Sequence, residues 1–140
     1  MVTKNTIFVL GPALSTSDGG SISVRFVKGI VEGSKAASGP PIICDVRDVA
    51  RAHVLAAEIP NAKGRHFVSQ PGAVLPEAMA AAIRGSVRDA GFEEEAALVP
   101  KAEAPQGETG KARIDASRTV NELGVFLRFS EETLRDAARP

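Results

Sequence analysis

The two histidines and the single cysteine are the side chains best suited to acid–base, nucleophilic or metal chemistry in this sequence. His53 lies among alanines, His66 lies in a short apolar run, and neither has a second His or Cys at metal-ligand spacing. No Cys–His–Asp arrangement indicates an activated nucleophile at Cys44. We therefore expect structural positions for both histidines and a small buried strand position for Cys44. We predict no catalytic residue and no metal site within this chain.

Arg47 and Asp48 are the strongest polar candidates for a functional pair. They could stand at the edge of a cleft near a substrate, or they could form a helix cap with a structural ion pair. We favour the structural interpretation for Asp48, because a carboxylate just before an alanine-rich apolar run is a preferred helix N-cap. Asp45 is expected to hold the same turn.

These candidates lie in one stretch, Asp45–Gly64, which predicts a strand end, a capped helix and a turn into the next strand. Pro60 ends the helix because proline cannot continue it, and Asn61 and Gly64 supply the turn. The rest of the chain alternates similarly. Apolar runs predict short strands at 6–10, 42–44 and 65–69, with a brief one at 98–100. Caps, prolines and glycines predict about five helices, at 21–32, 49–59, 75–90, 114–123 and 131–139, with Ser21 and Ser130 as N-caps.

Composition narrows the range of functions. Seventeen basic residues balance seventeen acidic ones, so we expect no nucleic-acid or anionic-membrane partner. The run Glu93–Glu95 is expected to be a solvated loop, and 101–112 a flexible surface loop. One cysteine fits a reducing, cytoplasmic compartment, and no apolar run approaches the roughly 20 residues that span a bilayer. Tyrosine and tryptophan are absent from the chain.

Alternating strands and helices predict an α/β fold with parallel strands. The predicted strands are too few and too short to form a sheet that is buried on both faces. We therefore expect a partial sheet within a single partial domain that spans 1–140.

Three blocks of the sequence resemble the C-terminal half of extended short-chain dehydrogenases/reductases. They are TIFVLGPAL, VRDVARAHVLAAEIPNAKGRHFVS and IDASRTVNELGVFLRFSEETLRDAAR. The most similar branch contains dihydroflavonol, cinnamoyl-CoA and aldehyde reductases of the epimerase/dehydratase superfamily. The resemblance implies the C-terminal, substrate-side portion of a Rossmann-like NAD(P)-binding fold. Residues 1–33 would hold its last Rossmann-type strand and helix, and residues 42–140 the substrate-side lobe.

Intact members of this family carry a glycine-rich dinucleotide motif and a Tyr-x-x-x-Lys catalytic pair. None of the 13 glycines has the G-x-G-x-x-G spacing, and the chain has no tyrosine. The resemblance implies NADP(H) as cofactor, with Ile7, Phe8 and Val9 near the nicotinamide. It places Ser21 near cofactor phosphate or substrate, although a plain N-cap role explains Ser21 equally well. The family's Asn-Pro pair reads Asn5-Thr6 here.

Two functions remain open on the sequence. The first is a C-terminal part of an NAD(P)-dependent oxidoreductase that reduces a small carbonyl or aldehyde substrate and is inactive alone. The second is a non-enzymatic α/β module, either a pseudoenzyme or an interaction domain. An uncovered sheet edge beside residues 6–10 would argue against the second, because such an edge invites pairing with other chains.

Overall fold

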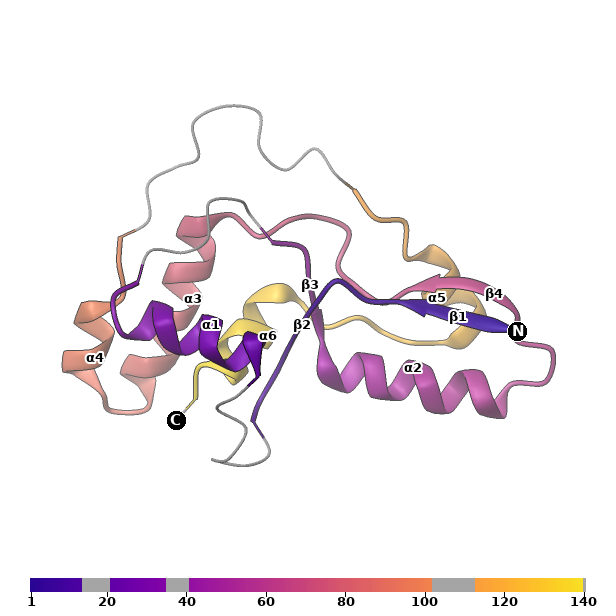
Figure 1. The fold of residues 1–140 in the computed structure, drawn as a ribbon, viewed down its shortest axis with the longest axis horizontal. Coiled ribbons are helices and arrows are strands. Elements are labelled where there is room, and N and C mark those ends of the chain that lie inside the picture. The colour runs from indigo at the N-terminus through magenta and orange to yellow at the C-terminus, as the bar shows by residue number, and fades with distance from the viewer. Residues whose placement is uncertain (14–20, 35–40, 102–112, 140) are drawn as a thin grey trace.

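A computed structural model describes residues 1–13, 21–34, 41–101 and 113–139 of the chain (Figure 1). Within these ranges strands and helices alternate along most of the chain. In order they are β1 (Val2–Asn5), β2 (Phe8–Leu10), α1 (Ile22–Val31), β3 (Ile43–Asp45), α2 (Val46–Glu58), β4 (Gly64–Phe67), α3 (Pro76–Asp89), α4 (Glu93–Leu98), α5 (Ser117–Leu123) and α6 (Ser130–Ala137).

The strands form two parallel pairs. β1 pairs with β4, with Val2 opposite Gly64, and β2 pairs with β3, with Leu10 opposite Asp45. Parallel strands need a crossover, and the helices between the paired strands supply it. The prediction of an α/β fold with few short parallel strands is confirmed.

The predicted single strand at 6–10 is wrong in its bounds, because the chain changes sheets there. β1 ends at Asn5, β2 begins at Phe8, and the two strands take different partners. The first strand was missed because its sequence, VTKN, is half polar and lacks the continuous apolar run of a buried strand. Figure 1 shows β1 and β2 leading in sequence from one half of the molecule into the other.

Each strand pair supports its own hydrophobic core. The larger core lies where α1, α3, α4 and α6 surround β2 and β3, and it includes the fully buried Ile43, Met79, Ile83 and Leu134. The smaller core lies between α2, β4 and the segment after α5, and it is built on Ala52, Val68, Leu123 and Val125. Figure 1 shows the two groups of elements at opposite ends of the long axis.

The N-cap of α2 is Asp45, so the prediction that Asp48 caps this helix is wrong. The Asp45 carboxylate accepts the backbone N–H of Arg47 at 2.8 Å, and helical geometry begins at Val46. Asp48 lies within the first turn. Both aspartates satisfy the local capping pattern, and long-range contacts decide between them.

The acidic run Glu93–Glu95 forms the first turn of α4, so the predicted loop there and the predicted strand at 98–100 are both wrong. All three glutamates are exposed, as expected. Their charges favour the positive N-terminal end of a helix. Ala96 and Val99 are buried in the larger core, which provides the packing that a six-residue helix needs.

The remaining helix boundaries follow the sequence signals closely, but the serine caps do not form. Ser21 occupies the N-cap position of α1 without a side-chain cap bond, and Ser130 is the first residue of α6, after Phe129. The Asp115 carboxylate accepts the N–H of Ser117 at 2.9 Å, and Gly124 ends α5 in the left-handed region, at φ 67°. The loop expected at 101–112 lies outside the described residues from 102 onward. None of the helices in the described ranges has the length and apolar character that crossing a bilayer requires.

Candidate functional site

A cleft of about 770 Å³ opens where β2 and β3 end, and we call it the strand-end cleft. Because the two strands are parallel and Leu10 lies opposite Asp45, both chains leave the sheet on the same side. Ligands of open α/β sheets bind at this carboxyl edge. Its lining is mainly apolar and consists of Val9, Leu10, Gly11, Pro12, Ala13, Ser21, Ser23, Val24, Val27, Val46, Arg47, Ala50 and Ala137.

The floor of the cleft depends on Gly11, which follows β2 directly. Its φ is +156°, and a Cβ there would stand 2.5 Å from Cγ1 of Val46. A side chain at this position is therefore excluded unless Val46 moves, because real Cβ atoms do not approach a carbon so closely. Glycine lets the end of β2 pass directly over the start of α2.

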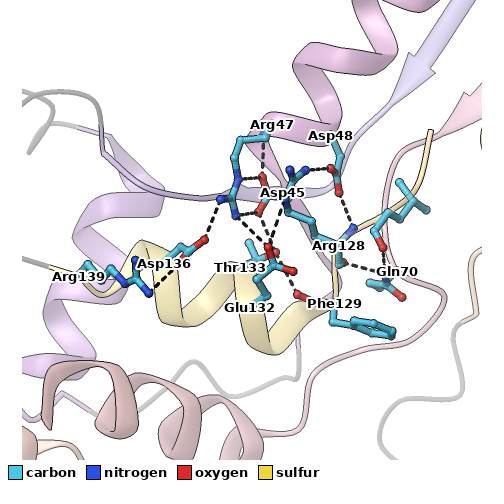
Figure 2. Close-up of polar contacts among 11 residues, drawn as sticks. Asp45, Arg47, Asp48, Gln70, Arg128, Phe129, Glu132, Thr133, Asp136 and Arg139 are labelled. Atoms are coloured by element: carbon cyan, nitrogen blue, oxygen red, sulfur yellow. Dashed lines mark hydrogen bonds and ion pairs between the residues drawn. The ribbon is translucent and has the colours of Figure 1, made fainter. Parts of the chain in front are cut away.

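Arg47 is the one charged side chain in the described lining. Its Nε and Nη2 donate to the two oxygens of Asp45 at 2.9 and 2.7 Å, and its Nη1 lies 2.8 Å from Asp136 of α6 (Figure 2). The hydrogen bond to Asp45 raises the pKa of Arg47, so the guanidinium keeps its charge. Arg47 thus joins the start of α2 to the last helix.

Asp45 is buried, with 2% of its surface exposed, and every partner it needs is present. Besides Arg47, it accepts the Thr133 hydroxyl at 3.0 Å. Burial by itself would raise the pKa of Asp45, but the hydrogen bonds from Arg47 and Thr133 outweigh it, and the pKa lies below its usual value. The carboxylate is therefore ionised at neutral pH and acts as a structural anchor.

Asp48 does not pair with Arg47, although the two are adjacent in sequence. Asp48 is buried, accepts the backbone N–H of Arg128 at 2.7 Å and forms an ion pair with the Arg128 guanidinium. The Gln70 amide donates to the carbonyls of Leu127 and Arg128 at 2.8 and 2.7 Å and fixes the same segment (Figure 2). The structural interpretation of Asp48 is supported, with an ion pair in place of the cap.

The residues proposed to contact cofactor lie in different surroundings. Val9 and Ser21 line the strand-end cleft. Phe8 packs edge-on against Phe26, with ring centroids 5.1 Å apart, and Ile7 is half exposed between the two strand pairs. The sequence did not indicate Arg128, Thr133 or Asp136 as partners of the α2 turn, because at least 80 positions separate the bonded residues and no local pattern records that proximity.

The side chains with the greatest chemical potential are far from this cleft or buried. His53 is exposed, with Nδ1 2.7 Å from the Val49 carbonyl, and His66 is fully buried, with Nε2 3.3 Å from the Lys63 carbonyl. Cys44 is buried in β3, as expected, and burial raises the pKa of its thiol. Across the described residues, no group of three His, Cys, Asp or Glu side chains is placed to hold a metal ion.

No protein-family model matches the chain. Among characterised proteins, it is 37% identical over 71 residues to cinnamoyl-CoA reductase 2 of Arabidopsis thaliana. That match covers 50% of this chain and 21% of the plant protein.

Solved reductases share the fold over nearly the whole chain. Gre2 from Candida albicans is 25% identical with a TM-score of 0.72, covering 97% of this chain and 42% of that one. The yeast methylglyoxal/isovaleraldehyde reductase Gre2, solved with NADPH, is 22% identical with a TM-score of 0.65, covering 98% and 44%. Alfalfa vestitone reductase is 22% identical with a TM-score of 0.63, covering 97% and 42%. The chain thus spans less than half the length of these relatives. The resemblance to extended short-chain dehydrogenases/reductases is confirmed, and the chain has the fold of part of such a reductase.

Proposed function

We propose that this chain forms the substrate-side part of an NADP(H)-dependent reductase that acts on an aldehyde or ketone. The observation that carries the proposal is the strand-end cleft, which lies at the carboxyl edge of parallel strands in a fold shared with three reductases. Its mainly apolar lining suits a small organic substrate. The chain alone is expected to be inactive, because it contains no tyrosine to exchange a proton with the substrate oxygen.

The described residues fit one end of the cofactor only. Val9 and Ser21 line the cleft, and we propose that they contact the nicotinamide end or the substrate, with Ile7 and Phe8 shaping the approach. The chain has no G-x-G-x-x-G spacing to cradle a pyrophosphate. NADP(H), which supplies a hydride to the carbonyl carbon when bound, therefore needs further protein to hold it.

The proposed division of labour follows the two strand pairs. Residues 1–33 would carry the last Rossmann-type strand and its helix, and 42–140 the substrate-side lobe. Strand β1 has β4 as its one partner among the described residues, which supports a larger sheet continuing beyond β1. The single, buried cysteine supports a cytoplasmic, reducing location.

NADPH oxidation with 3-methylbutanal tests the proposal. The 140-residue chain is measured alone and fused behind the remaining part of the Candida albicans Gre2 reductase. The chain alone is expected to show no oxidation above the rate without enzyme, and the fusion to oxidise NADPH in an aldehyde-dependent manner. Turnover by the chain alone contradicts its inactivity. A folded fusion without turnover contradicts the reductase role and favours a non-enzymatic module.

A further inference from the structure

The charges around the strand-end cleft carry information about its ligand. We propose that the cleft takes an uncharged, apolar carbonyl compound and disfavours ligands that present a carboxylate or phosphate to it. This inference rests on the proposed function, because it names the substrate class of the same site. It follows from how Arg47 is paired.

Arg47 is the natural anion receptor of the cleft, but its donors are already engaged. Both oxygens of Asp45 accept from one edge of the guanidinium, and Asp136 accepts from the other nitrogen at 2.8 Å. Glu132 stands 4.0 Å away as a third carboxylate. A bidentate site for a ligand carboxylate would have to displace Asp45, which is buried and has no solvent to replace the contact.

The wider network of Figure 2 adds to this effect. It contains four carboxylates, from Asp45, Asp48, Glu132 and Asp136. Three guanidiniums balance them, from Arg47, Arg128 and Arg139. The cluster behind the cleft wall therefore has one formal negative charge in excess. An incoming anion is repelled at short range, and the apolar lining offers it little compensation for lost hydration.

A neutral carbonyl group meets no such penalty. The polar atoms that remain in the lining are the hydroxyls of Ser21 and Ser23, both at the start of α1. A hydroxyl can donate a hydrogen bond to a carbonyl oxygen without needing a countercharge. The lining thus favours the class of small neutral aldehyde over a substrate whose charged group must enter the cleft.

A matched pair of probes tests the charge preference directly: 3-methylbutanamide and 3-methylbutanoate have nearly the same shape and differ in charge. Each is titrated into the ¹⁵N-labelled 140-residue chain at pH 7. The amide is expected to shift the backbone resonances of Val9, Val46, Ala50 and Ala137, with at least about 10-fold weaker binding of the carboxylate. Equal or tighter carboxylate binding overturns the proposal, and so does an amide that leaves these resonances unmoved.

The Asp136→Asn variant tests the cause. Removing one carboxylate from Arg47 is expected to improve carboxylate binding relative to amide binding by about 5-fold or more. Asp89→Asn is the matched control, because Asp89 pairs with Arg135 away from the cleft lining and should leave the ratio unchanged. An unaltered ratio in folded Asp136→Asn overturns the assigned mechanism. If that variant does not fold, the wild-type probe pair still decides the proposal.

These outcomes are separable from the reductase role. If the Gre2 fusion reduces 3-methylbutanal and an aldehyde bearing a carboxylate with equal kcat/KM, the charge preference fails while the reductase role stands. If the fusion is folded but inactive and the amide still binds selectively, the reductase role fails while the charge preference stands.

Discussion

Asp48 and Arg128 are 80 positions apart in sequence and are joined twice, because one carboxylate receives both the backbone N–H and the guanidinium of the arginine. Asp48 is almost fully buried, and the Arg128 side chain is one third exposed. The pair attaches the start of α2 to the segment that leads into α6, next to the Asp45–Arg47–Asp136 contacts. The wall of the strand-end cleft is therefore held by residues from distant parts of the chain.

Replacing Asp48 is expected to destabilise the fold strongly. Asp48→Ala leaves a backbone N–H and a guanidinium without their acceptor, which costs about 3 kcal/mol of unfolding free energy. Urea denaturation followed by circular dichroism measures the loss. Asp89→Ala is the control, since its partner Arg135 and Asp89 itself are largely exposed, and it should cost less than about 1 kcal/mol. Similar losses in the two variants would contradict the structural role of Asp48.

Acid is expected to weaken the fold through Asp45. The folded-state pKa of Asp45 lies below its unfolded value of about 3.9, so its contribution is fully present above that pH and is lost as the pH falls through the folded pKa. Urea midpoints measured between pH 6 and pH 2.5 should fall at the acid end. The decline should be shallower in Asp45→Asn, which cannot ionise. Parallel pH profiles for wild type and variant would contradict this assignment.

Gly11 is expected to tolerate no side chain. Gly11→Ala places a methyl group against Val46 at a backbone angle that L residues rarely adopt, and it should cost about 1–3 kcal/mol. Gly72→Ala is the matched control, since nothing lies within 4 Å of a Cβ at that position, and it should be neutral or slightly stabilising. Thermal melting of both variants checks the difference. Equal melting temperatures would show that the close approach at Gly11 is absent.

The strand-end cleft is expected to lose its ligand when Ala50 is enlarged. Ala50→Trp projects a large ring from the first half of α2 into the cleft, and it should weaken 3-methylbutanamide binding by about 10-fold or more. Val54→Trp is the control, because Val54 lies one turn further along α2, is 55% exposed and does not line the cleft. Resonance titrations compare the two. Unchanged binding by Ala50→Trp would place the ligand elsewhere.

Cys44 is expected to be nearly inert in the folded chain. Burial raises the pKa of its thiol, and access is closed, so the thiolate that reacts with alkylating reagents is scarce. Iodoacetamide at pH 8 should modify the native chain at least about 100-fold more slowly than the chain in urea. Mass spectrometry follows the modification. Comparable rates would show that β3 is exposed to solvent.

Several local elements followed from local sequence alone. Pro76 marks the start of α3, Gly124 the end of α5, and the Pro60 turn the end of α2, because proline and glycine restrict or permit backbone angles whatever surrounds them. The apolar spacing of α1 and the parallel α/β order followed from side-chain periodicity. These signals act over a few residues, so the sequence by itself determined them.

Tertiary structure decided where local signals were degenerate. Both Asp45 and Asp48 suit an N-cap, and Asp45 takes that place because Arg128 occupies Asp48. Residues 2–10 divide between two sheets because β4 and β3 offer separate partners, and the acidic run becomes α4 because Ala96 finds a place in the core. The pairing of Arg47 with Asp136, and with it the charge of the cleft, arises from contacts between residues about 90 positions apart. Only the folded chain brings those residues within hydrogen-bonding distance.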